Sequence, residues 1–308
     1  GPLHGIPVSI KDLSPTKGIR TTRGSLVYKD DIPEEDDITV ERLRDSGAVF
    51  LGKTNTPEFG HRGTTENLLG DACRNPWNTE RTTGGSSGGA AAALAADLCA
   101  LATGSDGGGS IRIPAGFCGV YGIKPSQGRV PFNYTNPGGW RVFSQTGPMA
   151  RNVRDATLLF QVLAGPDRRD PLSIPQDPPD FEKACIPDAK DLKIAWSPDL
   201  GFAPVDPEVK NIAQKAALKF SSLGATVEEV DLKLDGEKVL DVFRTVWISD
   251  YVVNYGHLLP KHRNDLDPVF TNFLEEAGRW SAAKLAAAIH DLEWHRDQMA
   301  KLFDKYDL

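Results

Sequence analysis

The sequence contains little of what several common functional sites require. It has four cysteines among 308 residues, and they form no C-x-x-C pair and no cysteine and histidine spacing of the kind that holds zinc. We therefore expect no metal and no cofactor. The thiols are expected to be reduced and buried, as in a cytoplasmic protein; they belong to Cys73, Cys99, Cys118 and Cys185.

Two further shortages exclude classes of partner. Acidic residues (42) outnumber basic residues (35), and the net charge of −7 gives no electrostatic reason to expect nucleic acid. No apolar run approaches the ~20 residues that a membrane span needs, because Gly, Asp or Ser interrupts each candidate. The sequence therefore predicts an enzyme-sized chain that does not bind nucleic acid, with no membrane-binding segment detectable in this part of the protein, and it leaves a homo-oligomer open.

Glycine, in contrast, is concentrated in one passage. Eleven of the 30 glycines fall between Gly84 and Gly122, and Ser86 and Ser110 lie in two glycine-rich turns of that passage. Glycine adopts positive φ at low cost and lets the backbone approach a ligand closely. This density indicates a site at which backbone meets a reacting group.

Local signals predict the shape of this passage. Ser86 or Ser87 is expected to cap a helix over 88–96, and the apolar run 98–103 to form a strand buried on both faces. The chain must then turn, which places Ser110 at the strand end, where open α/β sheets hold ligands. Backbone N–H groups of the turn are expected to converge as an anion-binding nest; they belong to Gly107, Gly108, Gly109 and Ser110.

Three interpretations of the nest compete. Phosphate binding lacks its motif, because Ile111 and Arg112 follow Ser110 where a P-loop has Lys. Residues 84–88 satisfy the G-x-S-x-G pattern of a nucleophile elbow centred on Ser86, but the segment before them is expected to be turn-rich rather than a strand. The preferred interpretation makes Ser110 the nucleophile and the glycine amides its oxyanion hole.

A serine nucleophile needs a base, and no histidine lies in the passage. His290 and His295 belong to a charged helix, where a surface role is expected. Lys11 is the better candidate, because it ends the strand-like run 5–12 and would point toward the same crevice. Burial lowers the pKa of a lysine and makes a neutral amine available as base. The competing interpretation is an ordinary exposed lysine.

Several blocks together resemble the amidase signature family in order and spacing. Lys11 and Ser86 are 75 residues apart, and Ser86 and Ser110 are 24 apart, as in that family's Ser-cisSer-Lys triad. The resemblance covers about the first half of the chain. Its blocks are 6–12, 52–59 (G-K-T-N-T-P-E-F), 74–78 (R-N-P-W-N), 84–89 (G-G-S-S-G-G), 106–114 (D-G-G-G-S-I-R-I-P), 122–125 and 147–151.

The resemblance implies an amidohydrolase that acts through an acyl-serine. Ser110 would attack an amide or ester carbonyl, and Ser86 would relay its proton to Lys11. The oxyanion hole would consist of the amides of Gly107, Gly108, Gly109 and Ser110, supported by Ser87, Asp106 and Arg112. Asp106 and Arg112 are interpreted as an internal ion pair, with direct contact to substrate as the alternative. Gly107 departs from the Thr, Ser or Ile common in the family.

Three other functions remain open. The chain could be the family's amidotransferase component of a tRNA-dependent complex that forms glutamine or asparagine, a catalytically inert binding module on the same fold, or a histidine-dependent esterase built on Ser86. The intact set of Lys11, Ser86 and Ser110 favours a small-molecule amide as the substrate and hydrolysis as the reaction.

The expected fold is α/β, with a mixed, largely parallel central sheet covered by helices on both faces, and incomplete at both ends. We expect one domain over 1–308. Its parts are a core with the catalytic residues (1–164), a connection (165–190) and a variable portion that lines a substrate channel (191–308). Helices are predicted at 38–46, 88–96, 152–163, 207–223, 239–259 and 282–303, and strands at 49–52, 98–103, 192–196 and 226–230. Pocket candidates, which equally suit a core-facing stripe, are Phe243, Trp247, Tyr251 and Tyr255.

Overall fold

A computed structural model describes residues 1–132, 143–185 and 188–308. The chain forms two compact units, of which the first comprises Gly1–Cys185 and Val253–Glu275 and the second comprises Ile186–Val252 and Glu276–Leu308. The sequence analysis placed all of 191–308 in one portion, whereas the structure returns a segment of it to the first unit. Residues 186–187 of the predicted connection lie outside the described residues.

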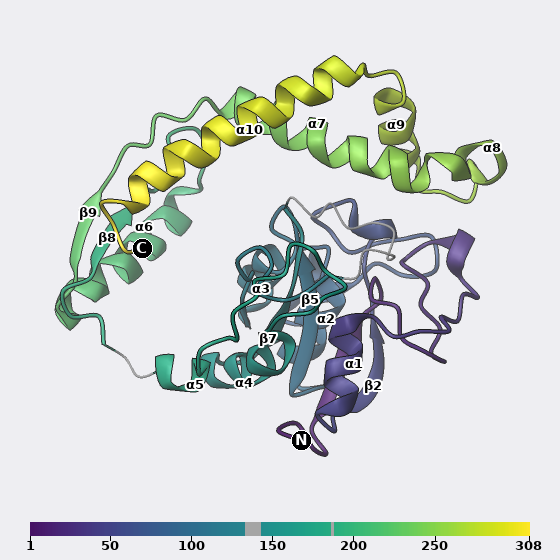
Figure 1. The fold of residues 1–308 in the computed structure, drawn as a ribbon, viewed down its shortest axis with the longest axis horizontal. Coiled ribbons are helices and arrows are strands. Elements are labelled where there is room, and N and C mark those ends of the chain that lie inside the picture. The colour runs from purple at the N-terminus through teal and green to yellow at the C-terminus, as the bar shows by residue number, and fades with distance from the viewer. Residues whose placement is uncertain (133–142, 186–187) are drawn as a thin grey trace. The chain divides into compact units, whose positions relative to one another are not determined.

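The first unit is built on a five-stranded sheet (Figure 1). Strand β1 is parallel to β2 and β5, whereas β7 is antiparallel to β5 and β6. Four strands therefore point one way and β7 the other, which confirms the mixed, largely parallel sheet. The order across the sheet is β2 (Val49–Thr54), β1 (Pro7–Lys11), β5 (Leu101–Asp106), β7 (Gln145–Ala150) and β6 (Tyr121–Gly122).

Helices cover both faces of this sheet, as predicted. Helices α1 (Ile38–Asp45) and α4 (Val153–Leu163) share one buried apolar cluster with Val8 and Ile10, while α2 (Gly88–Ala95) and α3 (Arg112–Cys118) share a second cluster with Ala102 and Met149. Successive side chains of a strand point to opposite faces. Because Val8 and Ile10 face α1 and α4, Lys11 emerges on the side of α2.

Strand β5 begins and ends later than the predicted strand over 98–103. The backbone N–H of Leu98 donates to Ala93 and that of Asp97 to Leu94, so both residues close the end of α2. Asp97 has a φ of 57° and Leu98 is 72% exposed, which excludes it from a buried strand. Pairing with β7 then carries β5 as far as Asp106, and Ser110 lies in a separate turn beyond it.

The approach to Ser86 also differs from the expectation of a turn-rich segment. Strand β4 (Asn78–Thr82) precedes the serine turn, but it pairs with β3 (Arg74–Asn75) as a separate antiparallel ribbon outside the main sheet. The remaining elements of this unit are α5 (Phe181–Ala184), α8 (Leu259–His262), most of α9 (Pro268–Ala277) and the short 3-10 turns η1 (Leu26–Tyr28), η2 (Glu58–Gly60) and η4 (Gly256–Leu258).

The second unit contains a parallel pair of strands and long helices. Strand β8 (Lys193–Trp196) pairs with β9 (Thr226–Glu229), and α10 (Ala282–Phe303) has the predicted bounds, with the Ser281 side chain as its N-cap. After α10, Asp307 and Leu308 form backbone hydrogen bonds with β8. The other elements are α6 (Pro207–Leu218), η3 (Lys219–Leu223), which replaces the predicted end of α6 as a 3-10 turn, and most of α7 (Gly236–Tyr255), whose last residues belong to the first unit.

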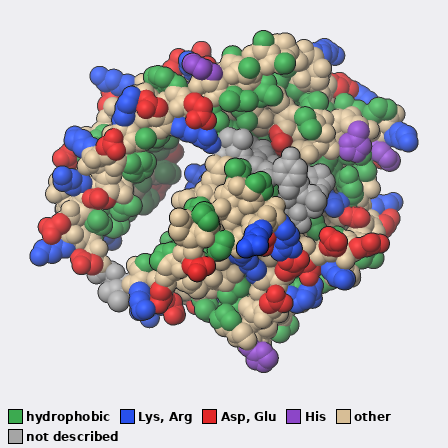
Figure 2. Space-filling view, viewed as in Figure 1, with side chains coloured by type: hydrophobic (Ala, Val, Ile, Leu, Met, Phe, Trp, Pro, Cys, Tyr) green, Lys and Arg blue, Asp and Glu red, His purple; other side chains and the backbone are tan. Residues whose placement is uncertain are grey.

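Charges of both signs are interspersed on the face shown in Figure 2, and neither sign gathers into one continuous patch there. Among the described residues, none of the helices combines the length and the apolar character that crossing a membrane requires.

Candidate active site

Lys11 lies at the centre of a cluster of hydroxyl groups. Lys11 is 1% exposed. Its Nζ lies 2.7 Å from Ser86 Oγ and 2.8 Å from Ser87 Oγ. Ser105 contributes two more oxygens, with Oγ at 3.0 Å and the carbonyl at 3.2 Å. Burial lowers the pKa of Lys11 to about 7, although the negative charge of Asp106 opposes the shift. Near neutral pH the amine is therefore available in its unprotonated form.

The four oxygens determine how a neutral Lys11 amine is oriented. A neutral amine has two N–H groups and one lone pair, and the Ser105 carbonyl can only accept a hydrogen bond. The Ser87 hydroxyl lies 3.3 Å from that same carbonyl and accepts from the Ser105 N–H. Ser87 can therefore donate to the carbonyl while accepting from Lys11. This arrangement leaves the Ser86 hydroxyl free to donate to the amine lone pair.

The turn that carries Ser86 and Ser87 depends on close backbone approach. The peptide bond between Gly85 and Ser86 is cis. A Cβ on Gly88 would lie 2.3 Å from Thr65 Oγ1, whose hydroxyl donates to the Gly84 carbonyl and accepts from the Gly88 N–H. Only glycine fits at such a distance. The tight contact with the loop that contains Thr65 therefore explains why residue 88 is a glycine.

Ser87 occupies the predicted cap position of α2, but its side chain does not cap the helix. It forms no cap hydrogen bond to the first turn. Its hydroxyl contacts Lys11 and Ser105 instead. The sequence thus placed Ser87 correctly at the start of α2. Its hydroxyl, however, forms a hydrogen bond with the buried Lys11 amine instead of capping the helix.

The turn after β5 is organised by Asp106, whose residue is 0% exposed. Its carboxylate accepts hydrogen bonds from the backbone N–H groups of Gly109 (2.7 Å), Ile111 (3.1 Å) and Arg112 (3.3 Å). The Arg112 side chain adds two contacts of 2.9 Å through Nε and Nη2. Burial by itself would raise the pKa of Asp106, but these hydrogen bonds and the charge of Arg112 hold that pKa below its ordinary value.

Gly109 therefore cannot serve as the oxyanion donor that the sequence predicted while this contact is made, because its N–H already donates to Asp106. Its φ of 114° suits glycine, and a Cβ there would lie 2.7 Å from Ile113 Cδ1. Within the described chain, the N–H groups of Gly107, Gly108 and Ser110 have no hydrogen-bond partner. Three of the four expected donors are thus available.

Asp106→Asn is expected to lower the free energy of unfolding by about 2–4 kcal/mol, because a buried carboxylate that accepts five N–H donors becomes an amide that cannot pair with Arg112. The folded-state pKa is depressed, so this contribution is present above pH ~4 and is lost as the pH falls through the folded pKa. Chemical denaturation at pH 7 and pH 3 measures both effects. The exposed Asp30→Asn variant is the control, and equal stability of the two variants would contradict the account.

The two serine turns are joined by one backbone contact. The N–H of Ser87 donates to the carbonyl of Ser110 at 3.0 Å, which brings the expected nucleophile to the turn that carries Ser86. Among the described contacts there is no hydrogen bond between the hydroxyls of Ser110 and Ser86. Likewise, no histidine of the described chain, which includes all six, forms a hydrogen bond with Lys11, Ser86 or Ser110.

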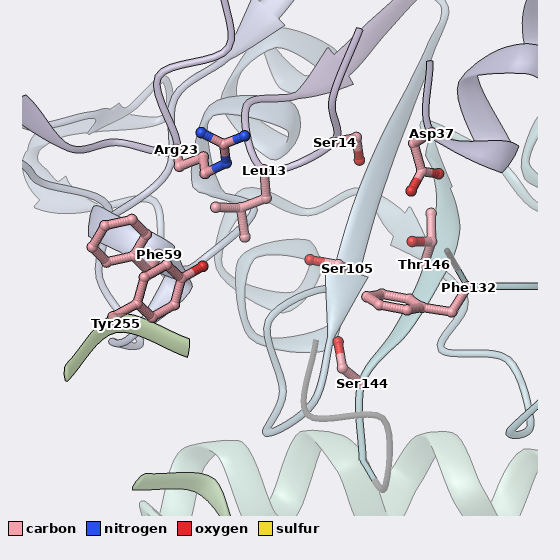
Figure 3. A pocket seen from close by; sticks show the side chains of 10 residues that line it. All are labelled: Leu13, Ser14, Arg23, Asp37, Phe59, Ser105, Phe132, Ser144, Thr146 and Tyr255. Carbon is pink, nitrogen blue, oxygen red and sulfur yellow. The ribbon is translucent and has the colours of Figure 1, made fainter. Parts of the chain in front are cut away.

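A small cavity of about 40 Å³ lies beside this cluster (Figure 3). Ser105, which contacts Lys11, belongs to its wall, and so do Phe59 and Tyr255, whose rings stack with centroids 3.9 Å apart. The full lining is Leu13, Ser14, Arg23, Asp37, Phe59, Ser105, Phe132, Ser144, Thr146 and Tyr255.

Of the four aromatic pocket candidates, only Tyr255 lines this cavity. Phe243, Trp247 and Tyr251 contact one another along α7, with centroids 5.5 and 5.6 Å apart, and Tyr251 is 0% exposed. This ladder agrees with the alternative of a core-facing stripe. Of the two histidines expected on the surface, His290 is exposed and His295 is half-buried.

Ser105 and Lys53 were not singled out from the sequence. The register of β1 against β5 pairs Ser9 with Ala102, which by extension places Gly104 opposite Lys11 and Ser105 just beyond it. Strand alternation alone therefore does not predict the contact between Ser105 and Lys11. Lys53 Nζ donates to the Ser14 carbonyl, to Thr16 Oγ1 at 2.8 Å and to Thr21 Oγ1 at 3.1 Å, and burial lowers its pKa to about 8. It ties the loop that follows Lys11 to β2.

In the ranges that the structure describes, no group of three or more His, Cys, Asp or Glu side chains is arranged to hold a metal ion. The four cysteines are unpaired, with Cys99 and Cys118 buried and Cys73 and Cys185 half-buried. The contacts of the Lys11 amine are with three serine hydroxyls and one backbone carbonyl.

Comparison with known proteins identifies the family. The Amidase family model matches residues 1–308. This chain belongs to the Amidase family. The resemblance drawn from the sequence is thereby confirmed, and this Amidase-family chain has its relatives among amide-processing enzymes.

The chain is 40% identical over 289 residues to an acylamidase of Rhodococcus erythropolis, covering 94% of this chain and 60% of that protein. It is 46% identical over 232 residues to a glutamyl-tRNA(Gln) amidotransferase subunit of Carboxydothermus hydrogenoformans, covering 75% of this chain and 48% of that protein. A solved bacterial aryl acylamidase of the amidase signature family matches with a TM-score of 0.92 and 34% identity, over 99% of this chain and 65% of that one. The chain thus spans about half to two thirds of these relatives.

Proposed function

We propose that the chain carries the catalytic centre of an amidohydrolase, a hydrolase of carbon–nitrogen bonds that cleaves carboxylic amides through an acyl-serine intermediate, with aryl amides and esters among its substrates. The observation that carries this proposal is the buried Lys11 amine, 2.7 Å from Ser86 Oγ and with its pKa lowered to about 7. The names of the acylamidase and aryl acylamidase relatives support the same substrate class.

In the proposed reaction Ser110 is the nucleophile. Its Oγ bonds to the carbonyl carbon as its proton passes to Ser86 Oγ, while the Ser86 proton passes to the lone pair of Lys11. The Lys11 ammonium then returns a proton through Ser86 to the leaving nitrogen, the C–N bond breaks and the amine departs. Water repeats the sequence on acyl-Ser110 and releases the acid. The hydroxyl contact between Ser110 and Ser86 is expected to form when substrate binds, since such contacts often tighten only in the complex.

The tetrahedral intermediate carries a negative oxygen that needs donors in place before the reaction. The N–H groups of Gly107, Gly108 and Ser110 fill this role in the proposal. Removal of one oxyanion donor typically costs about 10²- to 10³-fold in kcat. Ser87, Asp106 and Arg112 act indirectly, because Ser87 orients Lys11 and the ion pair of the other two fixes the nucleophile turn.

The alternative function is that of the amidotransferase component, favoured by the 46% identity to the glutamyl-tRNA(Gln) amidotransferase relative. The acylamidase match favours hydrolysis, because it extends over 94% of this chain rather than 75%. An inert binding module would not require the buried amine among four oxygens, and a histidine-dependent esterase would require a histidine at Ser86.

The test is a panel of anilides, alkyl amides and phenyl esters incubated with the purified chain alone. The proposal predicts release of aniline or phenol without any partner protein or tRNA. Turnover that appears only with an ammonia-supplying partner and charged tRNA would instead establish the amidotransferase function. A Ser110→Ala sample corrects for contaminating hydrolases.

The proposal includes a small-molecule substrate and a cytoplasmic setting, the latter because four unpaired thiols suit a reducing compartment. Homo-oligomerisation stays a prediction that sedimentation velocity measures.

A further inference from the structure

Arg23 has an unusual environment in the loop that follows Lys11. Its backbone has a φ of 54°, and its side chain is 11% exposed. Nη1 donates to Asp31 at 2.8 Å, and the guanidinium lies 4.4 Å from the centre of the Tyr28 ring. These contacts hold the guanidinium in one place.

The Nε–H of Arg23 is buried, and within the described residues it has no hydrogen-bond partner. A buried donor without an acceptor is unfavourable, and native proteins rarely retain one without a purpose. Asp31 accepts a hydrogen bond from Nη1 of Arg23. It accepts none from Nε. The described contacts therefore leave this donor without an acceptor.

The side chain of Arg23 lines the same small cavity as Ser105. In Figure 3 the guanidinium lies at one end of the cavity next to Leu13, with the stacked rings of Phe59 and Tyr255 nearby. The cavity thus combines apolar and aromatic side chains with several hydroxyl groups and one fixed guanidinium. Polar groups that converge on a pocket fix the orientation of its ligand.

Leu13 connects this cavity to the proposed catalytic centre. A Cβ added at Gly60 would lie 3.0 Å from Leu13 Cδ1 and 3.1 Å from Ser86 Oγ, so both side chains lie close to the same point beside Gly60. On the other side, Ser105 Oγ lies 3.0 Å from Lys11 Nζ. A substrate held at the catalytic serines therefore has the cavity as an immediate neighbour.

We propose that this cavity binds the acyl part of the substrate, and that the Arg23 Nε–H selects short acyl groups that carry a neutral oxygen acceptor, a carbonyl or ether oxygen. This inference rests on the proposed amidohydrolase function. The carbon atoms of the acyl group pack on Leu13 and Phe59, and its oxygen accepts a hydrogen bond from the Nε–H of Arg23. The volume of about 40 Å³ limits the group to a few heavy atoms.

The charges around the cavity favour a neutral acceptor over a carboxylate. Asp31 already balances the charge of Arg23, and the acidic side chain of Asp37 lines the same cavity. A carboxylate would meet this second acid, whereas a carbonyl or ether oxygen accepts the hydrogen bond without adding charge.

The experiment compares two anilides of similar shape, 4-oxopentanoyl anilide and 4-methylpentanoyl anilide. The parent chain is expected to show a kcat/KM about 10- to 100-fold higher for the oxo substrate, the range for a hydrogen bond to a charged donor. Arg23→Met is expected to abolish this preference while still hydrolysing the methyl substrate. Arg23→Lys, which lacks Nε–H, is expected to reduce the preference and serves if the Met variant fails to fold.

Two controls separate recognition from loop structure. Arg20→Met alters an exposed arginine of the same loop and is expected to keep the preference. Asp31→Asn removes the ion pair that holds the guanidinium and is expected to reduce the preference. Equal rates for the two anilides in the parent, or an undiminished preference in the Arg23 variants, would refute the inference alone. Failure of the parent to hydrolyse either anilide would refute the proposed function and the inference with it.

Discussion

Replacing Ser110 with alanine is expected to lower kcat by about 10⁴- to 10⁶-fold, the range seen when the nucleophile of a serine triad is removed. The alanine variant lacks the oxygen that forms the acyl-enzyme, while the backbone amides of residues 107, 108 and 110 and the Lys11 cluster remain. Binding should persist, so an inactive substrate analogue should retain its Kd. Initial rates of anilide hydrolysis at saturating substrate measure the loss.

The exposed Ser126 provides a matched control, because Ser126→Ala makes the same chemical change outside the site and is expected to leave kcat unchanged. If Ser110→Ala retained turnover while Ser86→Ala abolished an acyl-enzyme, the nucleophile would be Ser86, and the interpretation of 84–88 as an elbow would have to be restored.

Lys11→Met is expected to lower kcat/KM by about 10²- to 10⁴-fold, the usual contribution of a general base. In the parent, kcat/KM should rise with pH along a limb centred near pH 7, because burial lowers the pKa of Lys11 to about 7 and the neutral amine is the active form. The variant should lack this limb. A pH profile from 5.5 to 9.5 with one anilide measures both effects.

Lys53 supplies a control for the assignment of that limb. It is a second lysine, with a side chain that is 10% exposed and a pKa lowered to about 8 by burial, but its ammonium contacts the 14–21 loop and not Ser86. Lys53→Arg keeps the positive charge but introduces a side chain that stays protonated throughout the pH range measured. The limb near pH 7 should therefore remain. A limb that survives Lys11→Met, or that disappears with Lys53→Arg, would show that Lys11 is not the base.

The same pKa shift has a consequence for stability. The unfolded chain binds a proton at Lys11 up to pH ~10.4, whereas the folded chain releases it near pH 7. Between these values the unfolded state holds more protons, so the free energy of unfolding of the parent rises with pH. Relative to Lys11→Met, the parent should therefore gain stability from pH 7 to pH 10 in chemical denaturation, and an opposite slope would mean that the amine is buried in its charged form.

The sequence predicted the parts of this protein that follow from local patterns. The strand-like run that carries Lys11 forms β1, and α1 and α10 begin at Ile38 and Ala282, where the sequence placed them. The blocks around Lys11, Ser86 and Ser110 also led directly to the correct family. Each of these signals lies within a short stretch of chain.

Predictions failed where two distant segments compete for the same group. The hydroxyl of Ser87 could cap α2 or contact Lys11, and only the fold brings Lys11 within 2.8 Å. The prediction for the Gly109 N–H failed for a local reason, because this group donates to the buried carboxylate of Asp106, three residues earlier in the same turn. The end of β5 is set by its pairing with β7, which follows it by some 40 residues. The length of the apolar run does not contain this information, and the strand was therefore predicted too early in the chain.

Reaction of the parent chain with a fluorophosphonate, followed by tryptic digestion and mass spectrometry of the adduct, tests the central claim most directly. The account predicts one phosphonyl group per chain, on Ser110, with labelling that slows below pH 7 as Lys11 becomes protonated. An adduct on Ser86, or no adduct under conditions where the anilides are hydrolysed, would contradict it.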